Sequence, residues 1–248
     1  MTRIVENRIE VPGTPEEVWE AIATGHGIET WFVPAEVEGR VGGQVRLDMG
    51  SGLEDSGRVT EWSPPHRFAY EEEWAAVENE PPCRMASEFI VEAQQGGTCV
   101  VRLVSTLWGG GDGWDAVLEE MRRGWDAYFL ILRLYRTHFA GQPCTTVLAT
   151  RKDSIPRAQA TAELFAALEL EDAAPGEHVQ APRLAGFVEH RDEHELILRL
   201  TEPSPGVGIV YTYAWGDQVA INVHLYLYGE TSADPTDWRE WMAVPSPT

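Results

Sequence analysis

Residues 4–22 read IVENRIEVPGTPEEVWEAI, and this stretch decides how the fold begins. Apolar and polar residues alternate over residues 4–11, which is typical of a β-strand with one buried face. Pro12-Gly13 predicts a turn, after which Thr14 supplies a helix N-cap and Glu17 the third-position acid of a capping box. We therefore expect a strand that turns directly into a capped, amphipathic helix.

A much longer amphipathic helix is predicted further along the chain, over residues 114–139. Its apolar side chains recur every three or four residues and form one continuous stripe. About 26 residues at a rise of 1.5 Å give a length of roughly 39 Å, enough to cross a whole sheet. The intervening segments include strand-like stretches, among them 67–74 and a hairpin made by 84–92 and 98–107. This order predicts an α+β cup, in which a sheet is closed by one long helix.

The composition argues against several classes of protein. The 248 residues include 19 Lys or Arg against 40 Asp or Glu, which gives a formal net charge of −21. Nucleic acids and anionic membranes attract basic surfaces, so we expect neither as a partner. The cysteines Cys83, Cys99 and Cys144 form no C-x-x-C pair and are expected to be reduced thiols. Because no run approaches the roughly 18 apolar residues of a membrane helix, we expect a cytoplasmic protein.

Two domains are expected, residues 1–141 and residues 142–248. The second carries a predicted helix over 155–170. Its four strand-like stretches lie at 184–190, 196–201, 207–215 and 219–228. Both halves begin with a strand, a proline turn and a helix. The second half is therefore either an accessory α+β domain or a degenerate second copy of the cup, and the sequence leaves this choice open.

Five motifs of the first half carry a resemblance to a known family. They are Val11–Trp19, Trp31–Pro34, Gly42-Gly43, Gly57–Phe68 and Gly113-Trp114. Through them, residues 1 to about 140 resemble the START-like, or SRPBCC, superfamily, and most of all its branch named for the activator of the heat-shock-protein-90 ATPase. The resemblance implies a helix-grip fold, an antiparallel sheet wrapped on a long helix with an apolar cavity between them. We expect an α+β chain, this domain followed by a smaller α+β unit.

Aromatic residues are the candidates to line that cavity, because their rings supply large apolar walls for a ligand. The candidates are Trp19, Trp31, Phe32, Phe68, Tyr70, Trp74, Phe89, Trp125, Tyr128 and Phe129. The alternative for each of them is that its ring simply fills the core.

Polar side chains that face into the cup would mark a reactive site. Glu61, Tyr70 and Arg102 are the catalytic candidates, and Glu72 and Asp48 are further carboxylates in strand-like segments. A carboxylate in an apolar cup has a raised pKa and can act as a general acid or base. Arginine can hold a ligand carboxylate or a polarised carbonyl. The alternative is a solvent-facing or ion-paired residue, because a one-residue slip in register reverses every assignment.

No cofactor or metal is expected. The seven histidines form no metal signature, and the chain has no phosphate-binding loop, dinucleotide fingerprint or nucleophile elbow.

We therefore expect a binding protein that holds a small hydrophobic or aromatic ligand between sheet and long helix. One alternative is a cyclase, dehydratase or hydrolase that uses polar residues in the same cavity. The other is a co-chaperone-like interaction module with a chaperone partner. Edge strands in the sheets also make a homodimer an expectation. The superfamily includes lipid carriers, hormone receptors, polyketide cyclases and co-chaperone domains, so the resemblance alone does not decide between these functions.

Overall fold

The computed structural model describes residues 2–50, 53–74, 81–111, 113–215, 218–231 and 233–243. The chain divides into two compact units, residues 1–138 and 139–248, and each has its own antiparallel sheet. We refer to them as unit 1 and unit 2. Across the described ranges, no helix is long and apolar enough to cross a membrane.

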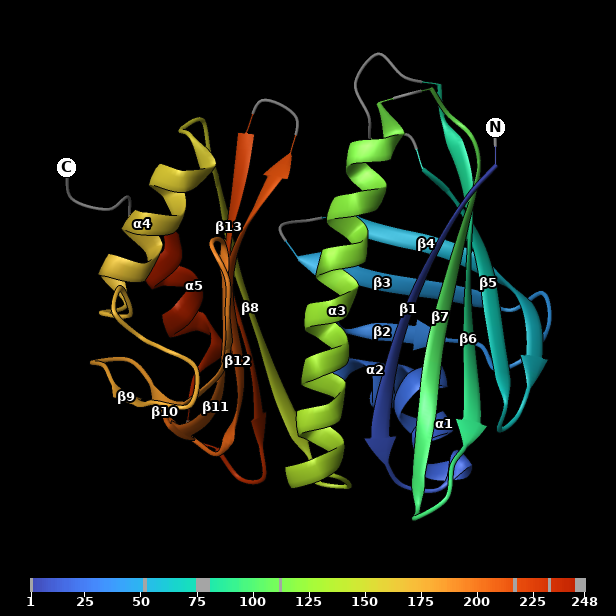
Figure 1. Cartoon of the computed structure of the whole chain (residues 1–248), viewed down its shortest axis with the longest axis horizontal. Coiled ribbons are helices and arrows are strands. Elements are labelled where there is room, and N and C mark those ends of the chain that lie inside the picture. Colours follow the sequence, from blue (N-terminus) through green and yellow to red (C-terminus); the bar gives the residue numbers. More distant parts are fainter. Residues whose placement is uncertain are drawn as a thin grey trace. The chain divides into compact units, whose positions relative to one another are not determined.

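Unit 1 is a seven-stranded sheet with one long helix and two short ones (Figure 1). Its elements are β1 (Thr2–Pro12), α1 (Pro15–Ala23), α2 (Gly25–Glu29), β2 (Ala35–Val37), β3 (Gln44–Gly50), β4 (Leu53–Ser63), β5 (Arg67–Trp74), β6 (Cys83–Ala93), β7 (Thr98–Gly109) and α3 (Trp114–His138). The strand order is β1-β7-β6-β5-β4-β3-β2, so the first strand pairs with the last and the helical crossover leads to the far edge. The expected helix-grip architecture, an antiparallel sheet wrapped on a long helix, is confirmed.

The capping box that opens α1 forms as the sequence predicts. The Thr14 hydroxyl accepts a hydrogen bond from the Glu17 amide at 3.3 Å, and the Glu17 carboxylate accepts one from the Thr14 amide at 3.0 Å. Two of the backbone donors at the helix start are thereby satisfied. The helix then buries Val18, Trp19 and Ile22 against the rest of unit 1.

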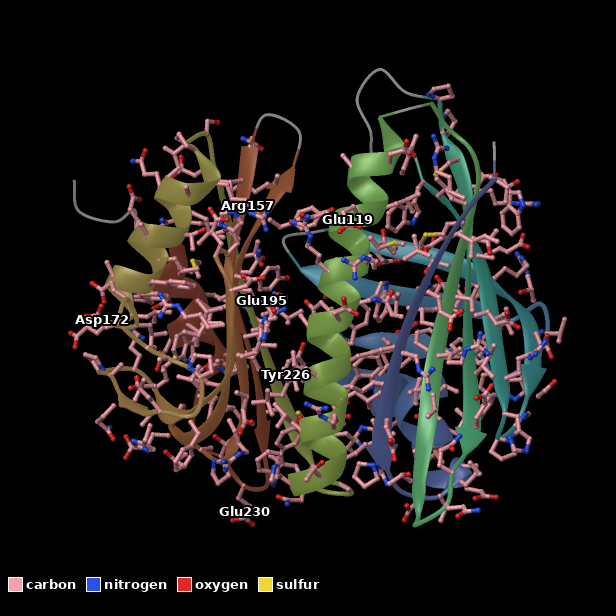
Figure 2. The ribbon with its side chains drawn as sticks, viewed as in Figure 1. Glu119, Arg157, Asp172, Glu195, Tyr226 and Glu230 are labelled. Carbon is pink, nitrogen blue, oxygen red and sulfur yellow. The ribbon has the colours of Figure 1, made fainter. Side chains whose placement is uncertain are left out.

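Helix α3 places its apolar stripe against the sheet and its charged residues on the exposed side. Trp114 and Leu118 belong to the core cluster that also contains residues of β6 and β7. On the exposed side, the Glu119 carboxylate lies 3.0 Å from the Arg122 guanidinium and 3.4 Å from that of Arg123 (Figure 2 labels Glu119). Surface pairs of this kind contribute little to stability, so the apolar stripe holds the helix in place.

Unit 2 repeats this strand order with one strand fewer. Its elements are β8 (Cys144–Asp153), α4 (Arg157–Ala167), β9 (His178–Gln180), β10 (Ala185–Arg191), β11 (Glu195–Glu202), β12 (Gly206–Trp215), β13 (Gln218–Tyr228) and α5 (Pro235–Ala243). The sheet order is β8-β13-β12-β11-β10-β9, so here too the first strand pairs with the last. Helix α5 packs on β8 as α3 packs on β1, although α5 has 9 residues and α3 has 25.

The core of unit 2 lies between its sheet and its two helices. Leu164 and Phe165 of α4 and Trp238 and Met242 of α5 pack on the alternating apolar residues of β13. The expected smaller α+β unit is confirmed. Its helices cover this face of the sheet with apolar side chains.

Candidate functional site

Aromatic side chains gather in the interior of unit 1, between the sheet and α3. The ring of Phe32 lies 4.9 Å from that of Trp125 and 4.6 Å from that of Tyr128, measured between centroids. Phe89 of β6 meets Trp125 edge-on at 5.8 Å. Trp31 is fully buried, and its indole N–H donates to the carbonyl of Ala21 at 2.9 Å. The turn after α2, strand β6 and helix α3 therefore contribute rings to one cluster.

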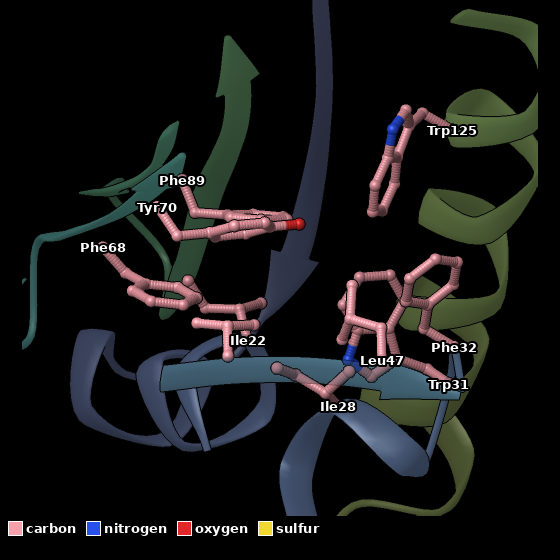
Figure 3. Close-up of a pocket in the computed structure, with 10 residues that line it drawn as sticks. Ile22, Ile28, Trp31, Phe32, Leu47, Phe68, Tyr70, Phe89 and Trp125 are labelled. Atoms are coloured by element: carbon pink, nitrogen blue, oxygen red, sulfur yellow. The ribbon is translucent and has the colours of Figure 1, made fainter. Parts of the chain in front are cut away.

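These rings and their aliphatic neighbours enclose a small apolar cavity, shown in Figure 3. Its lining residues are Ile22, Ile28, Trp31, Phe32, Val45, Leu47, Phe68, Tyr70, Phe89 and Trp125. The cavity measures about 10 Å³, which is room for about one water molecule. Nine of these residues are buried, whereas Trp125 is half-buried, so Trp125 is the lining side chain that reaches the surface.

The structure brings six of the ten aromatic candidates together around this cavity. They are Trp31, Phe32, Phe68, Tyr70, Phe89 and Trp125. The other four lie elsewhere in unit 1: Trp19 packs on Trp62 at 5.0 Å, Trp74 lies 6.4 Å from Trp114, and Tyr128 and Phe129 stand behind Phe32 and Trp31.

The aliphatic part of the lining was not among the candidates. It consists of Ile22, Ile28, Val45 and Leu47. The alternation of Val45 and Leu47 along one strand was the available signal for two of them.

Two of the polar candidates, Glu61 and Arg102, lie outside the cup, which corrects the expectation that they face into it. A β-bulge between Val59 and Glu61 breaks the alternation of β4, so Val59 is buried while the Glu61 carboxylate is exposed and lies 3.9 Å from the Arg67 guanidinium. Arg102 stands between two buried residues of β7 and therefore points outward, where it pairs with Glu6 at 2.9 Å and Glu92 at 3.3 Å. Asp48 is likewise exposed.

Three hydroxyl groups form a row across the inner face of the sheet. Tyr70 of β5 is directly opposite Ser87 of β6, and Ser87 is opposite Ser105 of β7. All three residues are at least 96% buried, and the Tyr70 phenol lies within hydrogen-bonding reach of Ser87. We call Tyr70, Ser87 and Ser105 the hydroxyl row. Figure 3 shows the phenol oxygen of Tyr70 pointing toward α3, which places one end of the row at the aromatic cavity.

Glu72 lies beside this row, one inward-facing position beyond Tyr70. It is 7% exposed, and burial, together with the nearby Asp55 carboxylate, raises its pKa to about 8. The Trp74 indole N–H is close enough to offset part of this shift, although it makes no hydrogen bond of normal geometry. Burial likewise raises the pKa of Asp55. Glu72 is therefore protonated near neutral pH and carries an O–H that can donate.

The interior of unit 1 thus has an apolar end and a polar band. The aromatic cavity can accept a planar apolar group, and the hydroxyl row with Glu72 can donate or accept hydrogen bonds beside it. On its other side the band meets a second apolar cluster that contains Met85, Leu107, Trp114 and Leu118. Within the described part of the chain, no group of three or more His, Cys, Asp or Glu side chains is placed to hold a metal ion.

The chain is similar to several solved structures at low sequence identity. The di-domain ARO/CYC BexL from the BE-7585A biosynthetic pathway is 16% identical, with a TM-score of 0.50 over 96% of this chain and 92% of its own. A protein from Mesorhizobium loti is 21% identical over 53% of this chain and 95% of its own, with a TM-score of 0.46. The Aha1 dimer from Colwellia psychrerythraea is 18% identical over 54% of this chain and 96% of its own, with a TM-score of 0.44. These identities bear on the fold alone.

A comparison with curated proteins finds no match. The sequence profile of the family described as "Activator of Hsp90 ATPase homolog 1-like protein" matches residues 12–136, which is half of the chain and nearly all of unit 1. The motifs that carry the resemblance lie almost entirely inside this range, and the sheet that wraps α3 is the fold that the resemblance implies. The chain therefore belongs to the Activator of Hsp90 ATPase homolog 1-like protein family.

Proposed function

We propose that unit 1 is a binding domain that holds a small hydrophobic or aromatic ligand between its sheet and α3. The observation that carries this proposal is the ring cluster around the cavity, in which Phe32, Phe89 and Trp125 meet with centroids 4.9 to 5.8 Å apart. Such rings offer flat faces and edges to a planar guest, and binding sites for small molecules are lined mainly by side chains of this kind.

The small volume of the cavity means that a ligand must displace part of the lining. Trp125 is the residue suited to move, because it is half-buried while the other nine lining residues are buried. Rotation of its indole toward the surface would free a space of about the size of one aromatic side chain without disturbing the sheet. Ligand entry then requires this rotation of Trp125, which enlarges the cavity.

Native mass spectrometry of the protein purified from its own host tests this proposal. The native spectrum is compared with that of the same sample after denaturation. We expect a released molecule of low mass that carries an aromatic or extended apolar group.

The matched variants are Trp125→Ala and Trp108→Ala. Trp108 stands on the outer face of the sheet, where the Arg84 guanidinium covers its ring at 4.8 Å. We expect loss of the bound molecule from the first variant and its retention by the second. The absence of any bound molecule, together with no binding of added indane, would contradict the proposal.

An enzyme is the second candidate, because two polar side chains, Tyr70 and Glu72, converge in the interior. A cyclase, dehydratase or hydrolase would use the Glu72 carboxyl as general acid or base, in place of the outward-facing Glu61 and Arg102. The test is to incubate the extracted molecule with fresh protein and to follow its mass and absorption. A change that Glu72→Gln abolishes would favour the enzyme, and an unchanged molecule would favour the carrier.

A homodimer, a chaperone partner and a cytoplasmic location stay predictions. Light scattering on the purified protein tests the homodimer, and capture of a heat-shock-protein-90 chaperone from a lysate of the same host tests the partner. Neither partner is needed for ligand binding inside unit 1.

A further inference from the structure

The hydroxyl row contains a donor that no other group in the described part of the chain engages. Ser105 is 1% exposed, and among the described residues its hydroxyl has no hydrogen-bond partner. Its neighbours on the same face of β7, Leu103 and Leu107, are core residues, so the hydroxyl points into the cup. Buried hydroxyls nearly always have a hydrogen-bond partner. One without a partner is available to a molecule that enters the site.

Tyr70 connects this row to the aromatic cavity. Its ring lies against the backbone of β4 at Gly57, where a Cβ atom would stand 2.9 Å from the Tyr70 Cδ2. The absence of a side chain at Gly57 therefore lets the ring lie flat and brings its oxygen to the cavity. A ligand whose rings fill the cavity would have its edge beside Tyr70 and the rest of the row.

On the sheet side of this band, the nearest titratable side chains include two carboxyl groups. Glu72 is surrounded by Asp55 of β4, Tyr70 of its own strand and Cys83 of β6, while α3 presents the apolar Trp114, Leu118 and Met121. Arg3 of β1 also lies near Cys83, but its guanidinium is engaged by Asp115 and by the carbonyls of Gly109 and Gly111. An anion placed beside this band would be repelled by the Asp55 carboxylate and would lose its hydration, whereas a neutral oxygen acceptor would meet O–H donors.

We propose that the hydroxyl row and Glu72 bind a neutral carbonyl group of the ligand, whose rings occupy the aromatic cavity, and that carboxylates and phosphates are rejected. This inference rests on the proposed function and adds the chemical class of the ligand. The donors offered to the carbonyl group are the hydroxyl of Ser105 at one end of the row and the carboxyl of Glu72 beside the other end, where Tyr70 adjoins the cavity. The ligand class is therefore an uncharged aromatic ketone or a close relative of one.

Three small probes of similar shape separate the contributions of the rings, the carbonyl group and a negative charge to the affinity. They are indane, which has no oxygen, 1-indanone, which adds the carbonyl, and 1-indanecarboxylate, which adds a charge. Calorimetric titration at pH 6.5 should give 1-indanone about tenfold tighter than indane, as one or two hydrogen bonds to a buried group provide. The carboxylate should bind more weakly than indane.

The variants Ser105→Ala and Glu72→Gln test the assigned donors. Ser105→Ala should lower the preference for 1-indanone over indane about fivefold, while leaving the melting temperature unchanged or raised, because no protein hydrogen bond is lost. The matched controls are Ser56→Ala and Glu61→Gln, whose side chains are exposed on β4. Both controls should keep the full preference.

The pH dependence of the affinity distinguishes a donor role of Glu72 from a purely structural one. As the pH rises past about 8, Glu72 ionises, and the affinity for 1-indanone should fall while that for indane changes little. Glu72→Gln should remove this dependence.

If indane binds but Ser105→Ala leaves the preference for the ketone unchanged and Glu72→Gln leaves its pH dependence unchanged, the inference is wrong and the proposed function stands. If neither indane nor 1-indanone binds, both are wrong.

Discussion

Replacement of Glu72 by glutamine should make unit 1 more stable at high pH. The carboxyl has an ordinary pKa of 4.5, and in the folded protein its pKa is about 8. The folded state therefore holds a proton that the unfolded chain has lost throughout this interval, and stability falls as the pH rises. The stabilising effect of that proton is complete below pH 4.5 and is lost as the pH passes 8.

The size of this change in stability follows from the difference between the two pKa values. At about 1.4 kcal/mol per pH unit, the passage from 4.5 to 8 lowers the free energy of unfolding by about 5 kcal/mol. Glutamine keeps a neutral side chain of similar shape at every pH. The difference in unfolding free energy between Glu72→Gln and the natural protein should therefore grow by about 4 kcal/mol between pH 5 and pH 9, most of it before pH 8.

Urea unfolding at half-unit steps of pH measures this difference. Seven of the ten tryptophans belong to unit 1, so the fluorescence signal reports mainly on that unit. Glu61→Gln is the matched control, because this carboxylate lies on the neighbouring strand β4, outside the cup. Asp55→Asn should lower the pKa of Glu72 in the folded protein, since the Asp55 charge contributes to raising it. A difference between Glu72→Gln and the natural protein that stays constant from pH 5 to pH 9 would show that the pKa of Glu72 is not raised in the folded protein.

Three further predictions concern packing and local structure, each measured by urea unfolding followed by far-ultraviolet circular dichroism. Trp31→Ala should cost about 3–5 kcal/mol, because the side chain is fully buried at the centre of the ring cluster; a loss below 1 kcal/mol would contradict that position. Gly57→Ala should cost about 1–3 kcal/mol by overpacking against Tyr70, whereas Gly124→Ala should add about 0.5–1 kcal/mol, since a Cβ there meets no described atom within 4 Å. Thr14→Ala should cost about 1 kcal/mol and Thr14→Ser almost nothing, and equal losses would argue against the cap.

The elements predicted well from the sequence are those whose signals are local. The capping box of Thr14 and Glu17 and the apolar stripe of residues 114–138 depend on neighbours within a few positions, and both formed as expected. The antiparallel order of unit 1 followed from the resemblance, because only related folds carry information on which strands pair.

The inward or outward direction of single strand residues was harder to predict. The bulge in β4 turns Glu61 outward, although simple alternation would have turned it inward. The residue types in that strand do not predict the bulge. For Arg102 a signal was present, since Val101 and Leu103 on either side are core residues. For Ser105 the same alternation was present, since Leu103 and Leu107 on its face are core residues, but a serine is usually exposed and this one was not among the candidates.

The selection of cavity residues among many aromatics depended on tertiary packing. Trp19 lies in α1 and Trp31 in the turn after α2, and both are buried, yet Trp19 packs on Trp62 and Trp31 lines the cavity. The sequence identifies both as large and apolar. Which of them reaches the cavity depends on how the crossover between β1 and β2 folds back on the sheet.

The pairing of each first strand with the last strand of its unit also has a consequence for how the chain folds. β1 finds its partner β7 only after residue 109 has been synthesised, and β8 must wait for β13 in the same way. Contacts so distant in sequence form slowly, and in the meantime the edge of β1 is open to pairing with other chains. Its outward positions Glu6, Arg8 and Glu10 are charged, which opposes such aggregation. Because every strand has its partners within its own unit, unit 1 can complete its sheet while unit 2 is still being made.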